Sequence, residues 1–349
     1  MKDRVESDYL PLAERRILVT GGTGYIGSHV VERLRSRGAC VLVLDNFTAP
    51  GLKFSEQSTD LSGASRMLRK VDIRHTEVTT DTLTWFNPDL VIHAAGLKSV
   101  PESMVSPLAY YDNNVGGTIS LLKAMDAAGC DRLIYASSAA VYGAATSWPI
   151  SEEHPLRGTN AYARSKIMIE QIVADWAVAK NGRSACGLRY FNPIGHRSSV
   201  STCVDGTSLI NGILRVAIGR SSEILVHGSD YPTPDGTGLR DFIHIDDLSD
   251  AHLAALNFVL HATGHAVFNV GSGQGTTVLQ LISMFETACG TRLPYRVHQR
   301  RKGDSAASIS CLKRIERNLG WRPQRSLEDA CLSAWRSVSF LALKGSVPH

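Results

Sequence analysis

A tyrosine and a lysine lie four positions apart in the segment Tyr162-Ala163-Arg164-Ser165-Lys166. On a helix, positions i and i+4 share a face, so the phenol and the ammonium would point at the same spot. Free tyrosine has a pKa of about 10, and a nearby ammonium favours the phenolate. The pair therefore predicts a general base that works near neutral pH. Ser137-Ser138 follows an apolar run ending at Ala136, where a hydroxyl can orient a substrate.

A glycine cluster near the N-terminus matches the fingerprint of a dinucleotide-binding turn. Gly22-x-Gly24-x-x-Gly27 has one of its spacings, and Gly21-x-x-Gly24-x-x-Gly27 has the alternative one. Glycines allow a tight turn and let a pyrophosphate approach a helix N-terminus, whose free N–H groups and dipole favour an anion. The cluster follows an apolar run and precedes a helical pattern, which is the context that this motif requires.

Asp45 is the residue predicted to bind a ribose of that dinucleotide. It ends the apolar run at 41–44 and lies 18 residues after Gly27. A carboxylate there accepts hydrogen bonds from both ribose hydroxyls and repels a 2′-phosphate. Because Asn46 rather than an arginine follows it, the sequence favours NAD over NADP.

These residues need a scaffold that brings the ends of several strands together. Strands alternating with helical patterns predict an α/β fold with a Rossmann-type, doubly wound parallel sheet. From about Asn192 onward Gly, Ser, Thr and Pro become frequent, which indicates a smaller C-terminal substrate-binding lobe over the strand ends. The strand candidates are 17–20, 41–44, 90–93, 133–136 and 185–190.

We expect three parts in the chain, and we find no internal repeat. Residues 1–14 are predicted to be a flexible N-terminal arm, and 49–66 are also expected to be mobile. Residues 15–191 would form the NAD-binding Rossmann domain, with 241–271 packing back onto it. Residues 192–345 would form mainly the substrate-binding lobe.

Composition excludes several classes of protein. The 349 residues are 43% hydrophobic and 20% charged, as in ordinary globular proteins. A net charge of +4 is too weak to predict binding to nucleic acid or to an anionic membrane, although a small anionic ligand is compatible with it. The sequence shows neither a secretory signal nor a membrane span. Seven scattered cysteines without a C-x-x-C pair predict no metal site and a reducing, cytoplasmic location.

Six segments of the chain form a wider pattern: residues 20–29, 93–98 and 110–115, the Tyr162…Lys166 pair, residues 189–193 and residues 238–244. Together they resemble the UDP-glucose/UDP-galactose 4-epimerase family of the extended short-chain dehydrogenases/reductases. The resemblance extends from about Arg16 to Trp335, nearly the whole chain.

The resemblance implies where NAD binds. Asp72 and Ile73 would bracket the adenine, and Asn113 and Tyr190 would flank the nicotinamide end. The implied cofactor-binding residues are Gly21, Gly24, Tyr25, Ile26, Asp45, Asn46, Asp72, Ile73, Ala94, Ala95, Gly96, Lys98, Asn113, Tyr162, Lys166 and Tyr190.

It also implies roles in catalysis. Tyr162 would be the base for the sugar 4-hydroxyl, Lys166 would lower its pKa, and Ser138 would hydrogen-bond O4. A hydride would pass from C4 to NAD and return to the opposite face after the 4-keto sugar rotates, without net redox. The implied substrate-binding residues are Lys98, Ser138, Tyr162, Asn192, Ser208, Leu209, Arg240, Arg301 and Asp304, with His227 near the uracil.

Departures from the family pattern leave the sugar open. Alanines follow Ser138 where related dehydratases carry an acid, so epimerisation is expected rather than loss of water. Arg197, five residues past Asn192, is able to pair with a carboxylate at C6, which makes UDP-glucuronate/UDP-galacturonate the alternative to UDP-glucose/UDP-galactose. It would otherwise point to solvent. Ser308 stands where a tyrosine excludes N-acetylated sugars in some relatives, so UDP-N-acetylhexosamines are a third option.

A protein of a different class with the same fold would be a non-catalytic NAD-binding regulator. The presence of Tyr162, Lys166 and Ser138 argues against that function. Family members usually pair through the helix that carries the tyrosine and the lysine, so the resemblance implies a homodimer.

Overall fold

The structure is a computed structural model, which describes residues 12–48, 67–197, 200, 208–301 and 304–344. Residues 1–11 and 49–66, where mobility is expected, lie outside the described ranges. The predicted extent of the N-terminal arm is corrected in one respect. Leu12 is buried in the core beside the first strand, so the chain is already held at this residue rather than at residue 15.

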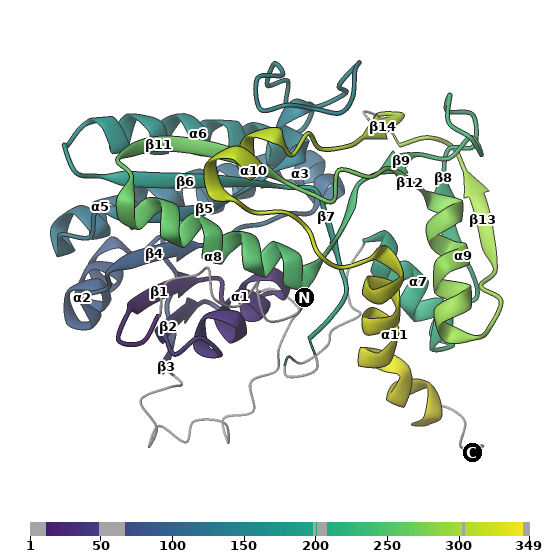
Figure 1. The fold of residues 1–349 in the computed structure, drawn as a ribbon, viewed down its shortest axis with the longest axis horizontal. Coiled ribbons are helices and arrows are strands. Elements are labelled where there is room, and N and C mark those ends of the chain that lie inside the picture. The colour runs from purple at the N-terminus through teal and green to yellow at the C-terminus, as the bar shows by residue number, and fades with distance from the viewer. Residues whose placement is uncertain (1–11, 49–66, 198–199, 201–207, 302–303, 345–349) are drawn as a thin grey trace.

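A seven-stranded sheet forms the centre of the molecule, and all its neighbouring strands run parallel (Figure 1). Its order is β11 (Gly264–Val270), β6 (Ser184–Tyr190), β5 (Arg132–Ser138), β4 (Leu90–His93), β1 (Arg16–Thr20), β2 (Cys40–Asp45) and β3 (Met67–Lys70). The strand order reverses between β1 and β4, and such a switch point is where open α/β sheets bind their ligands. The predicted Rossmann-type sheet is confirmed.

Helices cover both faces of this sheet because successive strand residues point to opposite sides. Ile17 and Val19 pack in a core cluster with α1 (Tyr25–Arg35) and α8 (Ile245–His261). Leu18 packs in a second cluster with the other layer, formed by α2 (Thr76–Phe86), α5 (Gly117–Ala128) and α6 (Ala161–Val178). Shorter helices between these elements are α3 (Val100–Val105), α4 (Pro107–Tyr110), the π-helix η2 (Tyr111–Gly116), the 3₁₀-helix η3 (Ala139–Tyr142) and α10 (Lys313–Leu319).

A smaller lobe with its own core lies beyond the carboxyl ends of the strands, where β6 leads into β7 (Figure 1). Its helices are α7 (Leu209–Ala217), α9 (Val278–Cys289) and α11 (Leu327–Lys344). Its short strands are β7 (Asn192–Ile194) with β10 (Phe242–His244), β8 (Ile224–His227) with β13 (Tyr295–His298), and β9 (Leu239–Arg240) with β12 (Thr276–Thr277) and β14 (Ala307–Ser308).

The chain leaves the lobe once to complete the central sheet. After β10 it continues into α8, which covers one face of the sheet, and then into β11, which pairs with β6 from Gly264 to Val270. Of the segment 241–271, α8 and β11 return to the first domain, whereas β10 stays in the lobe, where it pairs with β7. Among the helices in the described ranges, none is both long and apolar enough for a membrane crossing.

Candidate active site

The turn between β1 and α1 excludes side chains at two of its glycines. Gly21 has a φ of +68°, and a Cβ on it would lie 2.5 Å from the amide nitrogen of Ala95. A Cβ on Gly27 would overlap the carbonyl oxygen of Gly21. Gly24 is the N-cap of α1, so the first N–H groups of this helix are left without a side-chain cap. This arrangement fits the pyrophosphate of a dinucleotide.

Asp45 ends β2 beside this turn, as predicted. Its carboxylate accepts hydrogen bonds from the backbone N–H of Thr23 at 3.1 Å and of Phe47 at 2.9 Å. These bonds fix the carboxylate next to the glycines and leave each oxygen a second lone pair for a ribose hydroxyl. The geometry therefore suits the role expected of Asp45.

The residues predicted for the adenine end gather beside Asp45. The amide of Asn46 donates to Asp72 at 3.2 Å, and Arg74 pairs with the same carboxylate at 2.7 Å. The hydrogen bonds from Arg74 hold the pKa of Asp72 well below its usual range. Ile73 is buried and packs closely against Gly117, because a Cβ on that glycine would contact the Ile73 side chain.

The loop after β4, which contains the predicted residues Ala94, Ala95 and Gly96, is held by a residue that the sequence did not single out. Asn114 accepts the N–H of Leu97 at 2.8 Å and donates to its carbonyl at 3.0 Å. It also donates to Ser165 at 3.1 Å, while the predicted Asn113 donates to Asn114 at 2.9 Å. Both asparagines lie in the π-helix η2, an irregularity often found at functional sites.

The predicted catalytic residues come together from α6 and the end of β5. Asn160 caps α6 by accepting the N–H of Ala163 at 2.8 Å, and the helix then places Tyr162 and Lys166 on one face. Lys166 donates to the carbonyl of Ala136 at 2.8 Å, and Ser138 hydrogen-bonds Tyr162. A Cβ on Gly96 would lie 3.6 Å from the Lys166 ammonium, so the lysine borders the cofactor loop.

Burial dominates the electrostatics of this pair. Burial raises the pKa of Tyr162, and the hydrogen bond with Ser138 opposes that rise. Burial also lowers the pKa of Lys166 to about 8, against the opposing charge of Glu170. Because the lysine hydrogen-bonds a backbone carbonyl, it does not by itself make Tyr162 a phenolate. The positive charge of a bound nicotinamide is the further contribution that phenolate formation needs.

Four residues predicted for the nucleotide line one pocket of the lobe, with a volume of about 330 Å³. Ser208 caps α7 by accepting the N–H of Asn211 at 3.2 Å, and Leu209 begins the helix. His227 ends β8, and Arg301 lines the same pocket. Arg215 and Glu223 also line it, although the sequence did not single them out.

Arg240, Asn192 and Asp304 lie on neighbouring segments of the lobe. The guanidinium of Arg240 donates to the carbonyl of Leu239 at 3.0 Å, and burial lowers its pKa while the charge of Asp304 opposes this. Asn192 donates its side-chain amide to the carbonyl of Asp241 at 2.9 Å, next to Arg240. Ser308 pairs with Arg240 in the sheet of β9 and β14, so the small side chain does border this region.

The tyrosines predicted near the cofactor are tied to the protein through their hydroxyls. Tyr25 donates to the carbonyl of Gly195 at 2.7 Å, and the hydroxyl of Tyr190 hydrogen-bonds His252 at 2.8 Å. The Lys98 ammonium lies 5.9 Å from the centre of the Tyr25 ring. The neighbouring Ile26 packs against the core. The hydroxyls of both tyrosines are therefore already hydrogen-bonded within the protein.

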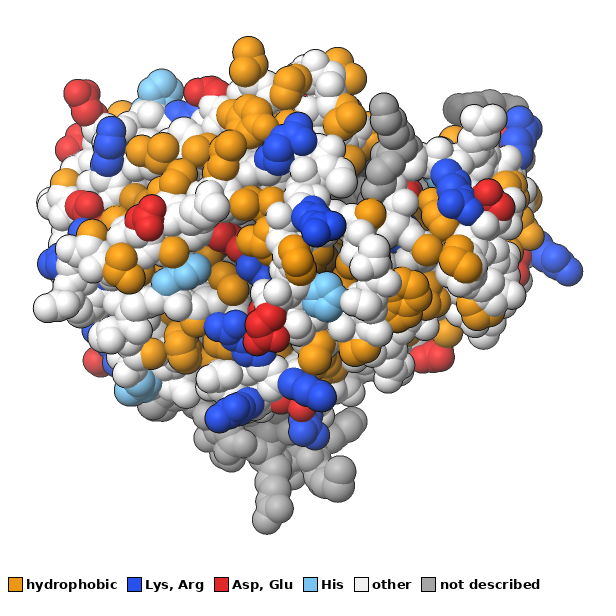
Figure 2. All heavy atoms as spheres, turned by 90° about the horizontal axis from the view of Figure 1, so that it is seen from above, with side chains coloured by type: hydrophobic (Ala, Val, Ile, Leu, Met, Phe, Trp, Pro, Cys, Tyr) orange, Lys and Arg blue, Asp and Glu red, His pale blue; other side chains and the backbone are white. Residues whose placement is uncertain are grey.

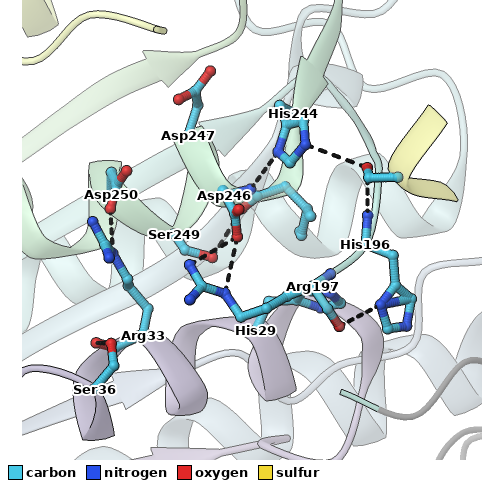
Figure 3. A network of polar contacts seen from close by, with 12 residues as sticks. His29, Arg33, Ser36, His196, Arg197, His244, Asp246, Asp247, Ser249 and Asp250 are labelled. Atoms are coloured by element: carbon cyan, nitrogen blue, oxygen red, sulfur yellow. Dashed lines mark hydrogen bonds and ion pairs between the residues drawn. The ribbon is translucent and has the colours of Figure 1, made fainter. Parts of the chain in front are cut away.

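Arg197 is committed to a partner within the protein (Figure 3). Its guanidinium donates to one carboxylate oxygen of Asp246 through Nε at 3.0 Å and Nη2 at 2.9 Å. Its backbone N–H donates to Nε2 of His29 on α1 at 3.1 Å. The arginine thus joins the start of α8 to the NAD-binding domain, and its charge is already balanced. The structure therefore gives no support to pairing with a sugar carboxylate, because Asp246 takes that place.

Comparison with known proteins gives a consistent result. The NAD dependent epimerase/dehydratase family matches residues 17–271. A UDP-glucose 4-epimerase of Bacillus subtilis is 40% identical over 324 residues, 92% of this chain and 96% of the relative. The crystal structure of a UDP-glucose-4-epimerase from Stenotrophomonas maltophila with NAD and formylated UDP-arabinopyranose has a TM-score of 0.89 at 37% identity, covering 95% of this chain and 100% of that one. One from Bifidobacterium longum with NAD⁺ and UDP has a TM-score of 0.86 at 36% identity, covering 93% and 98%.

Proposed function

The chain belongs to the NAD-dependent epimerase/dehydratase family, among its UDP-glucose 4-epimerases, and from this premise we propose that it interconverts UDP-glucose and UDP-galactose with NAD as cofactor. The reaction inverts C4 of the hexose through a 4-keto intermediate. The observation that carries the proposal is the convergence of Tyr162 and Lys166 on α6 with Ser138 on β5, beside the loop at Gly96.

The chain's own residues move one proton and hold the sugar. Tyr162 removes the proton of the 4-hydroxyl and returns it at the end of the cycle, while Ser138 holds the tyrosine and O4 in line. Lys166 contributes positive charge beside the tyrosine and hydrogen-bonds the cofactor ribose. NAD, when bound, accepts the hydride from C4 and gives it back to the opposite face, so the cofactor is unchanged after each turnover.

Residues of the lobe keep the nucleotide in place while the keto sugar turns. Arg240 and Arg301 supply the positive charge for a diphosphate, and Asp304 lies near Arg240. Ser208, Leu209 and His227 line the pocket for the uridine. Rotation of the sugar alone then presents either face of C4 to the same nicotinamide.

The neutral hexose is favoured over a uronate because Arg197 pairs with Asp246. For N-acetylated sugars, the small side chain of Ser308 beside Arg240 supports a second substrate class, the UDP-N-acetylhexosamines. Ser308→Tyr is expected to abolish turnover of UDP-N-acetylglucosamine and to spare UDP-glucose. Equal effects of the substitution on both sugars would remove this second class.

Proton NMR of the purified protein, incubated with UDP-glucose, UDP-glucuronate or UDP-N-acetylglucosamine without added NAD, tests the proposal. We expect new galacto-type H4 and anomeric signals from UDP-glucose, with no net change in NAD absorbance. Signals only from UDP-glucuronate would reject the neutral substrate. Silence with all three sugars from a protein that retains NAD would point to the non-catalytic regulator.

We also propose a homodimer formed through α6 and its neighbours. Large hydrophobic side chains are exposed on α3, α4, α5 and α6, which pack against one another, and Figure 2 shows hydrophobic groups between scattered charges on the side of α6. They are Met104, Val105 at 82% exposure, Leu108 at 79%, Ile119 and Met168. Leu108→Glu should convert a dimer to a monomer in light scattering, whereas Val297→Glu, on β13 of the lobe, should not. A monomeric wild-type protein would contradict this.

The cysteines support a cytoplasmic location, which we propose as well. The six cysteines in the described part of the chain form no disulfide, as is usual in a reducing compartment. Fractionation of cells that express the protein tests this, and recovery from a secreted fraction would contradict it.

A further inference from the structure

Glu170 is a buried carboxylate that the proposed mechanism does not use. It lies on α6 four residues after Lys166, which itself lies four residues after Tyr162, so all three share one face of the helix. Glu170 is 5% exposed and Lys166 is 6% exposed. A carboxylate buried this deeply is costly unless other groups neutralise and hydrogen-bond it.

Two strands supply those partners. Arg189 on β6 binds both oxygens of Glu170, through Nε at 2.9 Å and Nη2 at 2.6 Å, and Ser137 on β5 donates to it at 2.5 Å. Arg189 is held in turn by the hydroxyl of Tyr142 at 2.8 Å. The carboxylate therefore has a fixed position between α6 and the sheet.

Three side chains on one face of α6 contact the end of β5. Ser138 at the end of β5 hydrogen-bonds Tyr162, and Glu170 accepts from Ser137. Between them along α6, Lys166 binds the carbonyl of the preceding strand residue, Ala136. Three consecutive residues of β5 are thus each held by a different turn of one helix. Loss of the Glu170 contact would remove the side-chain hydrogen bond that holds Ser137, next to the catalytic hydroxyl.

We propose that Glu170 is a positioning residue for the catalytic pair: through Ser137 it fixes the place of Ser138, and, one helical turn from Lys166 on the same face of α6, it is a counter-ion that the lysine shares with Arg189. The proposal rests on the epimerase function proposed above. Glu170 contacts neither substrate nor cofactor in this scheme, and it acts through the lysine and the serine.

The charged and titratable groups around Lys166 agree with this role. On its own helix it faces Tyr162 and Glu170, and the charge of Glu170 opposes the lowering of the lysine pKa by burial. From β4 it faces His93, whose pKa burial and Lys166 lower to about 3, so this imidazole is neutral. From β6 comes Arg189, whose charge is paired with Glu170. Removal of the carboxylate therefore leaves burial unopposed and lowers the pKa of Lys166 further.

Glu170→Gln in the NAD-bound enzyme is the main test. We expect kcat to fall roughly 10- to 100-fold because the catalytic groups lose their fixed positions. We also expect the alkaline limb of the kcat–pH profile to move about one pH unit lower, because Lys166 deprotonates earlier. An unchanged alkaline limb with wild-type kcat would overturn the proposal.

Two further variants distinguish the loss of side-chain positioning from the loss of the Glu170 charge and from a general loss of protein stability. Ser137→Ala removes one hydrogen bond and keeps the carboxylate, so it should lower kcat about threefold to tenfold at unchanged KM and leave the alkaline limb in place. Asp247→Asn is the matched control, because Asp247 is a 1% exposed carboxylate paired with Arg325 away from Lys166. It should lower the melting temperature without moving the pH profile. If Glu170→Gln does not fold, wild-type kcat in Ser137→Ala overturns the proposal.

A measurement made without substrate tests the role of Glu170 separately from the epimerase function. NMR of isotope-labelled lysine side chains, with the Lys166 signal identified by its loss in Lys166→Met, reports the lysine pKa directly. A lower pKa in Glu170→Gln supports the counter-ion role even if no UDP-sugar is turned over. An unchanged Lys166 pKa in an active enzyme rejects the counter-ion role and leaves the epimerase function intact.

Discussion

The two halves of the site are built in opposite ways. In the catalytic half, Lys166 and Glu170 are buried between α6 and the sheet, and each has a hydrogen-bond partner on a strand. In the nucleotide half, Arg301 and Asp304 are exposed on a lobe of short strands. A chemical step needs side chains whose positions are fixed closely by a rigid scaffold. A charged nucleotide, by contrast, is bound by charged side chains on the surface of the lobe. Changes in the first half should therefore act on kcat and folding, and changes in the second on KM.

The largest effect is expected when an alanine substitution in the catalytic domain is compared with one in the lobe. Gly27→Ala should abolish NAD retention and turnover, because the new Cβ would overlap the carbonyl oxygen of Gly21. Gly212→Ala, inside α7 with no atom near its Cβ position, should stabilise the protein by about 0.5–1 kcal/mol. NAD content after purification and thermal melting measure both. A Gly27→Ala protein carrying a full complement of NAD would contradict the comparison.

Tyr162→Phe tests the catalytic half at its centre. We expect kcat to fall about 10²- to 10⁴-fold, since the general base is lost, with little change in the melting temperature. Tyr111→Phe is the control, because its hydroxyl accepts only an exposed hydrogen bond from Arg164 at 3.1 Å and should be dispensable. Steady-state NMR assays give the rates. Wild-type turnover by Tyr162→Phe would mean that another group takes the proton.

Arg301→Ala tests the nucleotide half. We expect KM to rise about tenfold with kcat nearly unchanged, as for the loss of one charge-assisted contact to a diphosphate. Arg300→Ala is its neighbour control, because Arg300 is paired with Asp230 at 2.7 Å. A fall in kcat without a change in KM would show that the lobe also takes part in the chemical step.

The smallest effect is expected at the boundary between the halves. Arg197→Ala removes the pair with Asp246 and should cost about 1 kcal/mol of stability. Because the arginine faces the protein, turnover of UDP-glucose and UDP-glucuronate should change by the same factor. Parallel assays with the two sugars measure this, and a selective loss with UDP-glucuronate would restore the uronate alternative.

Much of the catalytic half was predictable from the sequence because its signals are local. The glycine turn lies between an apolar run and a helical pattern, and the Tyr162–Lys166 spacing is a property of one helix. The roles of isolated residues were less predictable. The sequence singled out Asn113, whereas its neighbour Asn114 forms the buried contacts. The sequence does not distinguish the two asparagines, because the loop that they hold is brought to them only by folding.

The sequence by itself determined the elements and the side chains that each element presents on one face. Only the tertiary structure decided which of these side chains meet. Arg197 pairs with Asp246, 49 residues later, and Glu170 pairs with Arg189 on β6, the strand next to the one that carries Ala136, the partner of Lys166. The physical reason is that the period of a helix or strand is set by the local backbone. The pairing of buried charges depends on how separate elements pack, and no spacing within one element records it.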